Sequence, residues 1–222
     1  KRQVLSELYG AAVADEQRFL HRLLTGELRQ GALEGLMVEA VAAAADVPAA
    51  AVRRAFMLSG ELPGTAVTAL TGGEAALAEV SLRVGRPIRP MLAAPGDSLE
   101  AALAGLGPEV TVEHKLDGAR IQVHRDGERV RVWTRTLREV TDGVPELVEQ
   151  VRALPCRTAV LDGETLALDD DGRPRAFQDT MSRFGSDGPG GEPDAATVLS
   201  PFFFDLLHLD GTDLLDSPLE QR

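Results

Sequence analysis

Cysteine is scarce in this sequence, and a long apolar run is absent. The single cysteine, Cys156, cannot form an intrachain disulfide, which favours a reducing compartment. No uninterrupted apolar stretch approaches the ~18–20 residues that a membrane span needs, and no signal-peptide pattern opens the chain. We therefore expect a cytoplasmic protein without a membrane partner.

Lysine is also nearly missing. The chain holds 23 basic residues, of which only Lys1 and Lys115 are lysine and the others are arginine. An arginine stays protonated and cannot act as an amine nucleophile, whereas a lysine can. Lys115 is therefore the first candidate for amine chemistry.

Basic residues are fewer than acidic residues, 23 against 35. The formal net charge is −12, which by itself argues against non-specific binding to nucleic acid. The acidic excess is uneven, because residues 1–85 carry a net charge of −2 and residues 162–216 carry −10. Even the near-neutral first part is weak for a DNA binder, which typically presents a basic patch.

The sequence does contain enough apolar residues for one large or two modest domains. Its 222 residues are 44% hydrophobic, which excludes wholesale disorder and a fibrous repeat. It begins at Lys1 rather than Met and ends at Arg222 without a terminal signal, so we treat it as part of something longer.

The first 85 residues have the apolar spacing of helices and no strand-like alternation. We expect an amphipathic helix over 33–44, whose buried stripe would hold Leu33, Leu36, Met37, Ala40, Val41 and Ala44. Further helices are expected from an Asp15 cap to Gly26, from Pro48 to Gly60 and over 74–84.

Residues 85–96 contain five Gly or Pro in twelve positions, which is typical of an extended linker between domains. Beyond it the apolar period becomes that of strands. We expect strands over 109–115, 119–125, 129–135, 158–168 and 200–209, with helices over 98–106, 145–154 and 177–184. This second part is thus expected to be α+β, with mainly antiparallel pairing.

The register of one hairpin can be derived. Asp126-Gly127 between alternating runs predicts a two-residue turn, in which Arg125 faces Glu128. In that register Arg120 and Arg135 project from one surface, at the end of the hairpin away from its turn.

The segment Lys115–Gly118 comes directly before the first strand of this hairpin, at the end away from the turn. In the expected strand over 109–115, Glu113 and Lys115 share a face by the two-residue period. Two guanidinium groups nearby would suit a polyphosphate and would disfavour a protonated amine beside them. The residues alone suggest an amine that attacks a phosphoryl centre, although solvated surface side chains are the plainer alternative.

Several segments also match a known family in order. Lys115-Leu-Asp-Gly-Ala-Arg120 is similar to the K-x-D-G-x-R motif of the covalent nucleotidyltransferases, which are ATP-dependent DNA ligases, RNA ligases and mRNA capping enzymes. Leu161-Asp-Gly-Glu164 resembles the D-G-E motif, and residues 202–211 resemble the adenine-contacting motif. Residues 86–93 resemble the junction ahead of the ligase adenylation domain, and residues 24–31 resemble part of the helical DNA-binding domain of archaeal and eukaryotic replicative ligases.

This resemblance implies roles for the first motif and its neighbours. Lys115 would attack the α-phosphate of ATP, forming a phosphoramidate with AMP and expelling pyrophosphate. Glu113 would contact the adenine edge, and Arg120 and Arg135 would contact ribose and phosphate.

The later motifs imply two more roles, each with an alternative. Glu164 would serve the ribose or a divalent metal, but it could be an ordinary turn acid. Phe204 would stack on adenine, but it could be core, because Phe202, Phe203 and Phe204 should not all face one ligand.

The resemblance implies a multidomain fold, with a partial all-α DNA-binding unit over 1–85 and a truncated α+β adenylation domain over 86–222. The second domain would have antiparallel sheets and be ATP-grasp-like. Motifs and an oligonucleotide-binding domain that the family carries further on are not found, so this piece alone is expected to be inactive or poorly active.

The implied activity is that of an ATP-dependent DNA ligase. AMP would pass from lysine to the 5′-phosphate of a nick, and the 3′-hydroxyl would then displace AMP, with Mg²⁺ at each step. The expected partner is nicked double-stranded DNA and the expected state a monomer. Candidate phosphate contacts, each as readily a solvated surface residue, are Arg29, Gly31, Arg53 and Arg54.

Two other functions stay open. An RNA ligase or capping-type enzyme shares the lysine motif, but would not be expected to carry the helical first part. A non-catalytic DNA-binding scaffold with a decayed nucleotidyltransferase fold is the other alternative, against which the intact Lys115, Arg120 and Glu164 argue.

Overall fold

The computed structural model describes residues 2–25, 33–107, 109–184 and 198–222. The chain divides into two compact units, residues 1–40 and 41–222. The domain limits expected at residues 85 and 86 stay a prediction. Among the described helices, none combines the length and the apolar character needed to cross a bilayer.

The first unit holds α1 (Arg2–Ala11) and α2 (Ala14–Leu24). α2 begins after Val13, whose N–H donates to the Glu16 carboxylate at 2.9 Å. The expected cap, Asp15, is therefore wrong: it lies inside the first turn, where its charge favours the positive end of the helix dipole. No residue of α2 is buried.

α3 (Glu34–Ala45) confirms the helix expected over 33–44 but not its buried stripe. Leu36 and Met37 are 60% and 42% exposed, whereas Val38 and Ala42 are 2% and 4% exposed. The helix is apolar on nearly every side, so the spacing of its apolar residues does not select a face.

α4 (Ala49–Ser59) confirms the helix expected from Pro48 to Gly60. Gly60 closes it with φ 79°, and its N–H donates to the Phe56 carbonyl at 3.0 Å. The helix expected over 74–84 is confirmed only in part: the observed helix is α5 (Leu62–Ala78), and non-helical Gly73 divides it, so that its second stretch begins at the expected Glu74 but ends at Ala78. The positive φ of Gly73 interrupts the helical period, so the sequence on its two sides does not read as one element.

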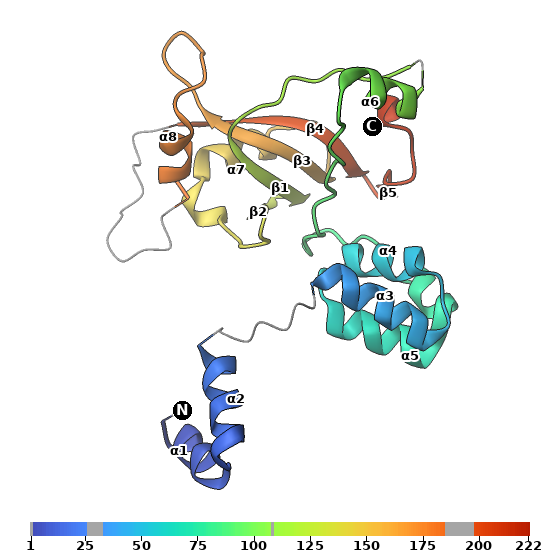
Figure 1. Ribbon diagram of the computed structural model, residues 1–222. Coiled ribbons are helices and arrows are strands. Elements are labelled where there is room, and N and C mark those ends of the chain that lie inside the picture. Colours follow the sequence, from blue (N-terminus) through green and yellow to red (C-terminus); the bar gives the residue numbers. More distant parts are fainter. Residues whose placement is uncertain (1, 26–32, 108, 185–197) are drawn as a thin grey trace. The chain divides into compact units, whose positions relative to one another are not determined.

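The second unit is an α+β domain built on one antiparallel sheet (Figure 1). The strand order is β2-β1-β3-β4-β5, with bounds β1 (Ala119–Asp126), β2 (Arg129–Thr134), β3 (Thr158–Ala167), β4 (Leu199–Leu209) and β5 (Thr212–Asp213). Besides α4 and α5, the unit contains the helices α6 (Leu99–Leu106), α7 (Pro145–Arg152) and α8 (Phe177–Ser182), with 3₁₀ turns at Thr141–Gly143 and Leu219–Gln221.

The strand expected over 109–115 is wrong. The described residues 109–117 have no regular secondary structure, and residues 109–115 are exposed. Alternating residues form a strand only where a neighbouring strand offers hydrogen bonds, and this segment has no such pairing among the described residues.

The expected hairpin register is also wrong, by two residues. Asp126 pairs with Arg129 and Val123 pairs with Val132, so the turn is Gly127-Glu128. Gly127 has φ 60°, as this tight turn requires. A shift of two residues keeps every side chain on its expected face, which a shift of one would not.

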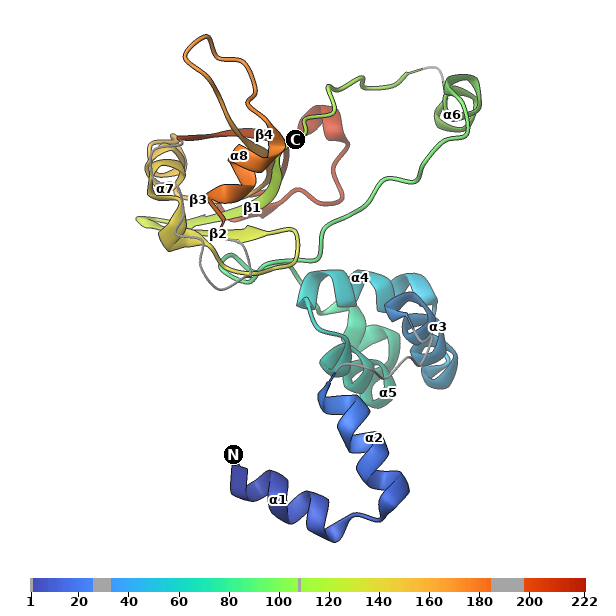
Figure 2. The same ribbon diagram turned by 60° about the vertical axis from the view of Figure 1, so that its left-hand side comes forward.

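Both faces of the sheet are covered. Helix α7 lies beside the sheet (Figure 2). On this face Ile121, Val123 and Val132 belong to the same apolar cluster as Leu147 and Val151 of α7. On the other face, Val160 and Leu207 pack with Leu58 of α4, Leu82 and Ile88. The expected linker therefore packs in part against the sheet.

His124 lies on this second face, 1% exposed. The backbone N–H of Gly85 donates to its Nδ1 at 2.8 Å, and Trp133 packs edge-on against its ring. Burial lowers the pKa of His124 to about 3, helped by the positive charge of Arg131 and by His208. The imidazole is therefore neutral in the folded protein at pH 7.

A pH-dependent loss of stability follows from His124. In the unfolded chain this histidine is protonated below pH 6.5, whereas in the folded chain it stays neutral down to about pH 3. The free energy of unfolding should therefore fall by about 1.4 kcal/mol for each pH unit as the pH is lowered through this window. Above pH 6.5 the contribution of His124 to the free energy of unfolding does not change with pH, because the residue is neutral in both states. Urea unfolding at pH 7 and pH 5 measures the effect.

The control is His124→Asn, whose side-chain oxygen can still accept from the Gly85 N–H but does not titrate. It should lack this part of the pH dependence, whereas His21, His114 and His208 remain in both proteins. An identical pH dependence in the variant and the unaltered protein would contradict the assignment.

Candidate active site

One cavity of about 1350 Å³ opens at the end of β1 and β2 and holds the residues that the motifs single out. All six expected nucleotide contacts line it: Glu113, Lys115, Arg120, Arg135, Glu164 and Phe204. They come from the irregular segment before β1, from β1, from the end of β2, and from β3 and β4. The fold thus brings together residues that lie up to 91 positions apart in the sequence.

Strand pairing sets the floor of the cavity. Arg120 of β1 faces Glu164 of β3, and Glu164 faces Phe202 of β4. Directly opposed residues of an antiparallel pair project from the same face, so these three side chains form one row across the sheet. The row thus brings together residues of the three motifs, at 115–120, 161–164 and 202–211.

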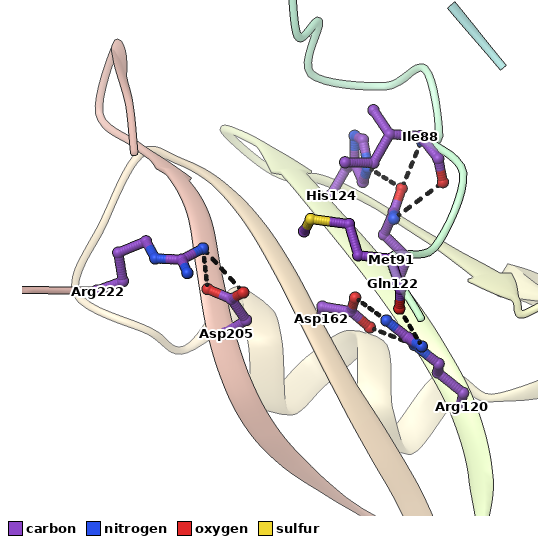
Figure 3. Close-up of polar contacts among 8 residues, drawn as sticks. All are labelled: Ile88, Met91, Arg120, Gln122, His124, Asp162, Asp205 and Arg222. Atoms are coloured by element: carbon purple, nitrogen blue, oxygen red, sulfur yellow. Dashed lines mark hydrogen bonds and ion pairs between the residues drawn. The ribbon is translucent and has the colours of Figure 1, made fainter. Parts of the chain in front are cut away.

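Arg120 is held firmly in this row (Figure 3). Its Nε and Nη2 donate to the two carboxylate oxygens of Asp162 at 3.0 and 2.7 Å, and its Nη1 donates to the Met91 carbonyl at 3.0 Å. The hydrogen bonds to Asp162 raise the pKa of Arg120. These contacts use three of the five N–H donors of a guanidinium group, which leaves two for a ligand.

The segment Lys115–Gly118 lies close against β3. The Gly118 N–H donates to Oε1 of Glu164 at 3.2 Å. A β-carbon at Gly118 would lie 2.3 Å from the Thr165 carbonyl oxygen and 2.9 Å from Cγ of Leu166. Only a glycine permits this approach, which places the Lys115 segment at the cavity.

Glu164 is a half-buried carboxyl beside several charges. Burial raises its pKa, while the Gly118 N–H and the positive charges of Arg120 and Lys115 act in the opposite direction. Glu164 is therefore in electrostatic contact with the amine and one guanidinium of the expected site.

Phe204 lies on β4 at an irregularity in strand pairing. Asp162 pairs with Asp205 and Gly163 pairs with Phe203, so Phe204 is an extra residue opposite β3. All three phenylalanines border the cavity, but Phe203 also packs against the apolar core, so which ring faces a ligand stays a prediction. The Arg120 guanidinium lies 5.7 Å from the centre of the Phe204 ring.

Several residues outside the motifs also line the cavity. Strand alternation over 109–115 would put His114 on the face away from Lys115, but the segment is not a strand and His114 lines the same cavity. Thr134, Thr136 and Arg138 after the hairpin line it too, as do Phe177, Met181 and Phe184 at α8. Apolar spacing in 177–184 predicts a helix but does not tell which cavity the helix borders.

The expected metal site can be tested against the donors present. Among the described residues there is no group of three or more His, Cys, Asp or Glu that could hold a metal ion. Two carboxylates, Glu113 and Glu164, line the cavity, and Glu164 lies opposite Arg120, one of the expected ribose and phosphate contacts. This fits Mg²⁺, which usually binds one or two carboxylates together with substrate phosphates and water.

The candidate DNA contacts are only partly described. Arg29 and Gly31 lie outside the described residues. Arg53 and Arg54 are exposed on α4. Arg54 donates to both carboxylate oxygens of Asp216, at 2.9 and 2.6 Å, so a phosphate would have to displace this carboxylate.

Residues 90–222 match the family described as "ATP dependent DNA ligase domain". Over its whole length the chain is 63% identical to a protein named "Probable DNA ligase" from Nocardia farcinica (strain IFM 10152), of which it covers 46%. It is also 63% identical to a protein of the same name from Rhodococcus opacus (strain B4), of which it covers 43%. The chain spans less than half the length of these relatives.

A solved structure titled "mycobacterial DNA ligase D complexed with ATP and MES" is 34% identical, with a TM-score of 0.38 over 50% of this chain and 33% of that chain. The family match covers more than half of the chain and contains all three motifs that line the cavity. The chain therefore belongs to the ATP-dependent DNA ligase family.

Proposed function

We propose that the full-length protein is an ATP-dependent DNA ligase that seals nicks in duplex DNA through a lysyl-AMP intermediate. The observation that carries this proposal is the shared cavity: Lys115, the only internal lysine of this sequence, lies there with Arg120, Glu164 and Phe204, which come from the three motifs, and with Glu113 and Arg135 from outside them. Family membership supports it.

In the first step, Nζ of Lys115 attacks the α-phosphorus of ATP. A P–N bond forms, the bond to the β-phosphate oxygen breaks, pyrophosphate leaves, and the amine gives up a proton. Arg120 and Arg135 would contact ribose and phosphate, since both line the cavity and Arg120 keeps free N–H donors.

Two further residues would hold the adenosine. Glu113 would accept from the adenine edge, and Phe204 would stack on the ring. Bound Mg²⁺ would neutralise charge on phosphate oxygens, with the Glu164 carboxylate as the protein ligand.

The remaining steps transfer AMP to DNA. A 5′-phosphate oxygen at the nick attacks the phosphorus of lysyl-AMP, which forms a P–O–P bond and returns the Lys115 amine. The 3′-hydroxyl then attacks the 5′-phosphate, AMP leaves, and the strand is closed.

DNA contacts would come from the helical part over 1–85, for which Arg29, Gly31, Arg53 and Arg54 are the proposed phosphate contacts. We further propose that the protein acts as a cytoplasmic monomer. We also propose that these 222 residues on their own are inactive or poorly active, since they span less than half the length of the relatives.

The test is the intact mass of the full-length protein after incubation with ATP and Mg²⁺. We expect the mass of one added AMP, removed again by excess pyrophosphate, and then sealing of nicked DNA. Sealing of nicked RNA in preference to DNA would favour the RNA ligase alternative. An unchanged mass would favour a non-catalytic scaffold.

Phe204→Ala tests the stacking role. Loss of base stacking costs ~1–3 kcal/mol per base, so the KM for ATP in AMP loading should rise about tenfold while Phe204→Tyr stays close to the unaltered protein. Phe19→Ala, at a half-exposed site on α2, is the matched control. An unchanged KM for Phe204→Ala would assign this ring to packing alone.

A further inference from the structure

The expected linker is bound to the sheet over its first half. We call residues 85–91 the strap. Its backbone contacts three alternate side chains of one face of β1: His124 accepts from Gly85, Gln122 bonds Ile88, and Arg120 donates to Met91. The strap therefore runs antiparallel to β1, with side chains in place of a backbone ladder.

Gln122 forms the central contact (Figure 3). Its Oε1 accepts from the Ile88 N–H at 2.8 Å, and its Nε2 donates to the Ile88 carbonyl at 3.2 Å. A side-chain amide thus satisfies both backbone groups of one residue, as a neighbouring strand would. Gln122 is 5% exposed and Ile88 1%, so these polar groups have little access to water.

His124 fixes the orientation of this amide. Nδ1 of His124 accepts from Gly85, so the neutral ring carries its proton on Nε2, which lies 2.9 Å from Oε1 of Gln122. Oε1 therefore receives two donors and Nε2 of Gln122 faces the Ile88 carbonyl. The amide has one orientation that satisfies every group.

The far end of the strap reaches the cavity. The Met91 carbonyl accepts from Nη1 of Arg120 at 3.0 Å, and the next residue, Leu92, lines the cavity. Asp162 fixes two other N–H groups of the same guanidinium. The Met91 carbonyl therefore adds a third acceptor, from the strap, to the two carboxylate oxygens that hold this guanidinium.

We propose that Gln122 is a positioning residue for the nucleotide: by anchoring the strap at Ile88 it places the Met91 carbonyl, which orients Arg120 toward the ligand. This inference rests on the proposed function. Gln122 does not line the cavity, so it acts through the strap and Arg120 and not by touching the nucleotide.

The test uses Gln122→Met and Gln122→Glu in the full-length protein. The first keeps the volume of the side chain and loses both hydrogen bonds, and the second keeps an acceptor for Ile88 N–H but has no donor for the Ile88 carbonyl. Gln150→Glu, an exposed change on α7, is the control. Circular dichroism and the urea midpoint identify variants that keep the fold.

Two readouts are compared. Hydrogen exchange of the Ile88 amide, which needs no ATP, should be at least tenfold faster in Gln122→Met, which removes its acceptor, and less affected in Gln122→Glu, whose carboxylate can still accept from it. The KM for ATP in AMP loading should rise about tenfold, with the maximal loading rate changed less than threefold, because binding is affected more than the attack. The control should match the unaltered protein in both.

Three results would overturn the inference. Unchanged exchange at Ile88 in Gln122→Met would show that Gln122 does not anchor the strap. In the same variant, faster exchange with an unchanged KM would make the anchor purely structural, and a raised KM with unchanged exchange would rule out action through the strap. Failure of the proposed function would give a different result. The unaltered protein would then load no AMP, although its Ile88 amide would still be protected from hydrogen exchange.

Discussion

Lys115→Arg should abolish AMP loading while leaving the fold intact. The guanidinium group stays protonated in water and has no lone pair available to attack phosphorus, so the first bond cannot form. We expect a loss of at least about a thousandfold, the scale on which removal of a nucleophile acts. Lys115 is exposed at the cavity, so the free energy of unfolding should change little.

The measurement is intact mass after ATP and Mg²⁺, with urea unfolding of the same samples. Lys1→Arg, the same change at the only other lysine, serves as the control and should load AMP normally. Undiminished loading of the Lys115 variant would show that another group is the nucleophile.

Gly118→Ala should reduce AMP loading by about a hundredfold or more. The added β-carbon would lie 2.3 Å from the Thr165 carbonyl oxygen, well inside van der Waals contact, so the Lys115–Gly118 segment must move away from β3. This weakens the Gly118 hydrogen bond to Glu164 and displaces the amine, and a displacement of ~1 Å at a reacting group costs on the order of a hundredfold.

The same variant should lose about 1–3 kcal/mol of stability, as expected when a well-packed site is overfilled. Gly105→Ala in α6 is the matched control, because a β-carbon there meets nothing within 4 Å. The loading rate and urea unfolding measure both effects. Normal loading by Gly118→Ala would mean that the segment does not need its close approach to β3.

Local patterns predicted most of the second unit. The strands at 119–126, 129–134, 158–167 and 199–209 follow from alternation, because each has a face that must be buried. Helices α6, α7 and α8 follow from apolar spacing together with Ser98 and Pro145 at their starts.

Features that depend on a partner segment could not be predicted in this way. The hairpin register differs by two residues because either neighbouring turn preserves the faces, and only packing against β3 and α7 selects between them. The bulge at Phe204 likewise exists only relative to β3. The segment at 109–117 alternates in sequence but finds no strand to pair with in the described structure.

The chemical groups that this protein offers could be read from its sequence: one interior lysine, the motifs around it, and the alternation that puts Arg120 on the face of its strand opposite Ile121 and Val123. Tertiary structure alone decided that these groups share a cavity with His114 and α8, and that a Gly- and Pro-rich linker is bound by Gln122 and His124. The physical reason is the distance along the chain over which each kind of interaction acts. Periodicity and turn propensity act over a few residues, whereas a cavity and a buried hydrogen bond need atoms that the chain brings together from far apart.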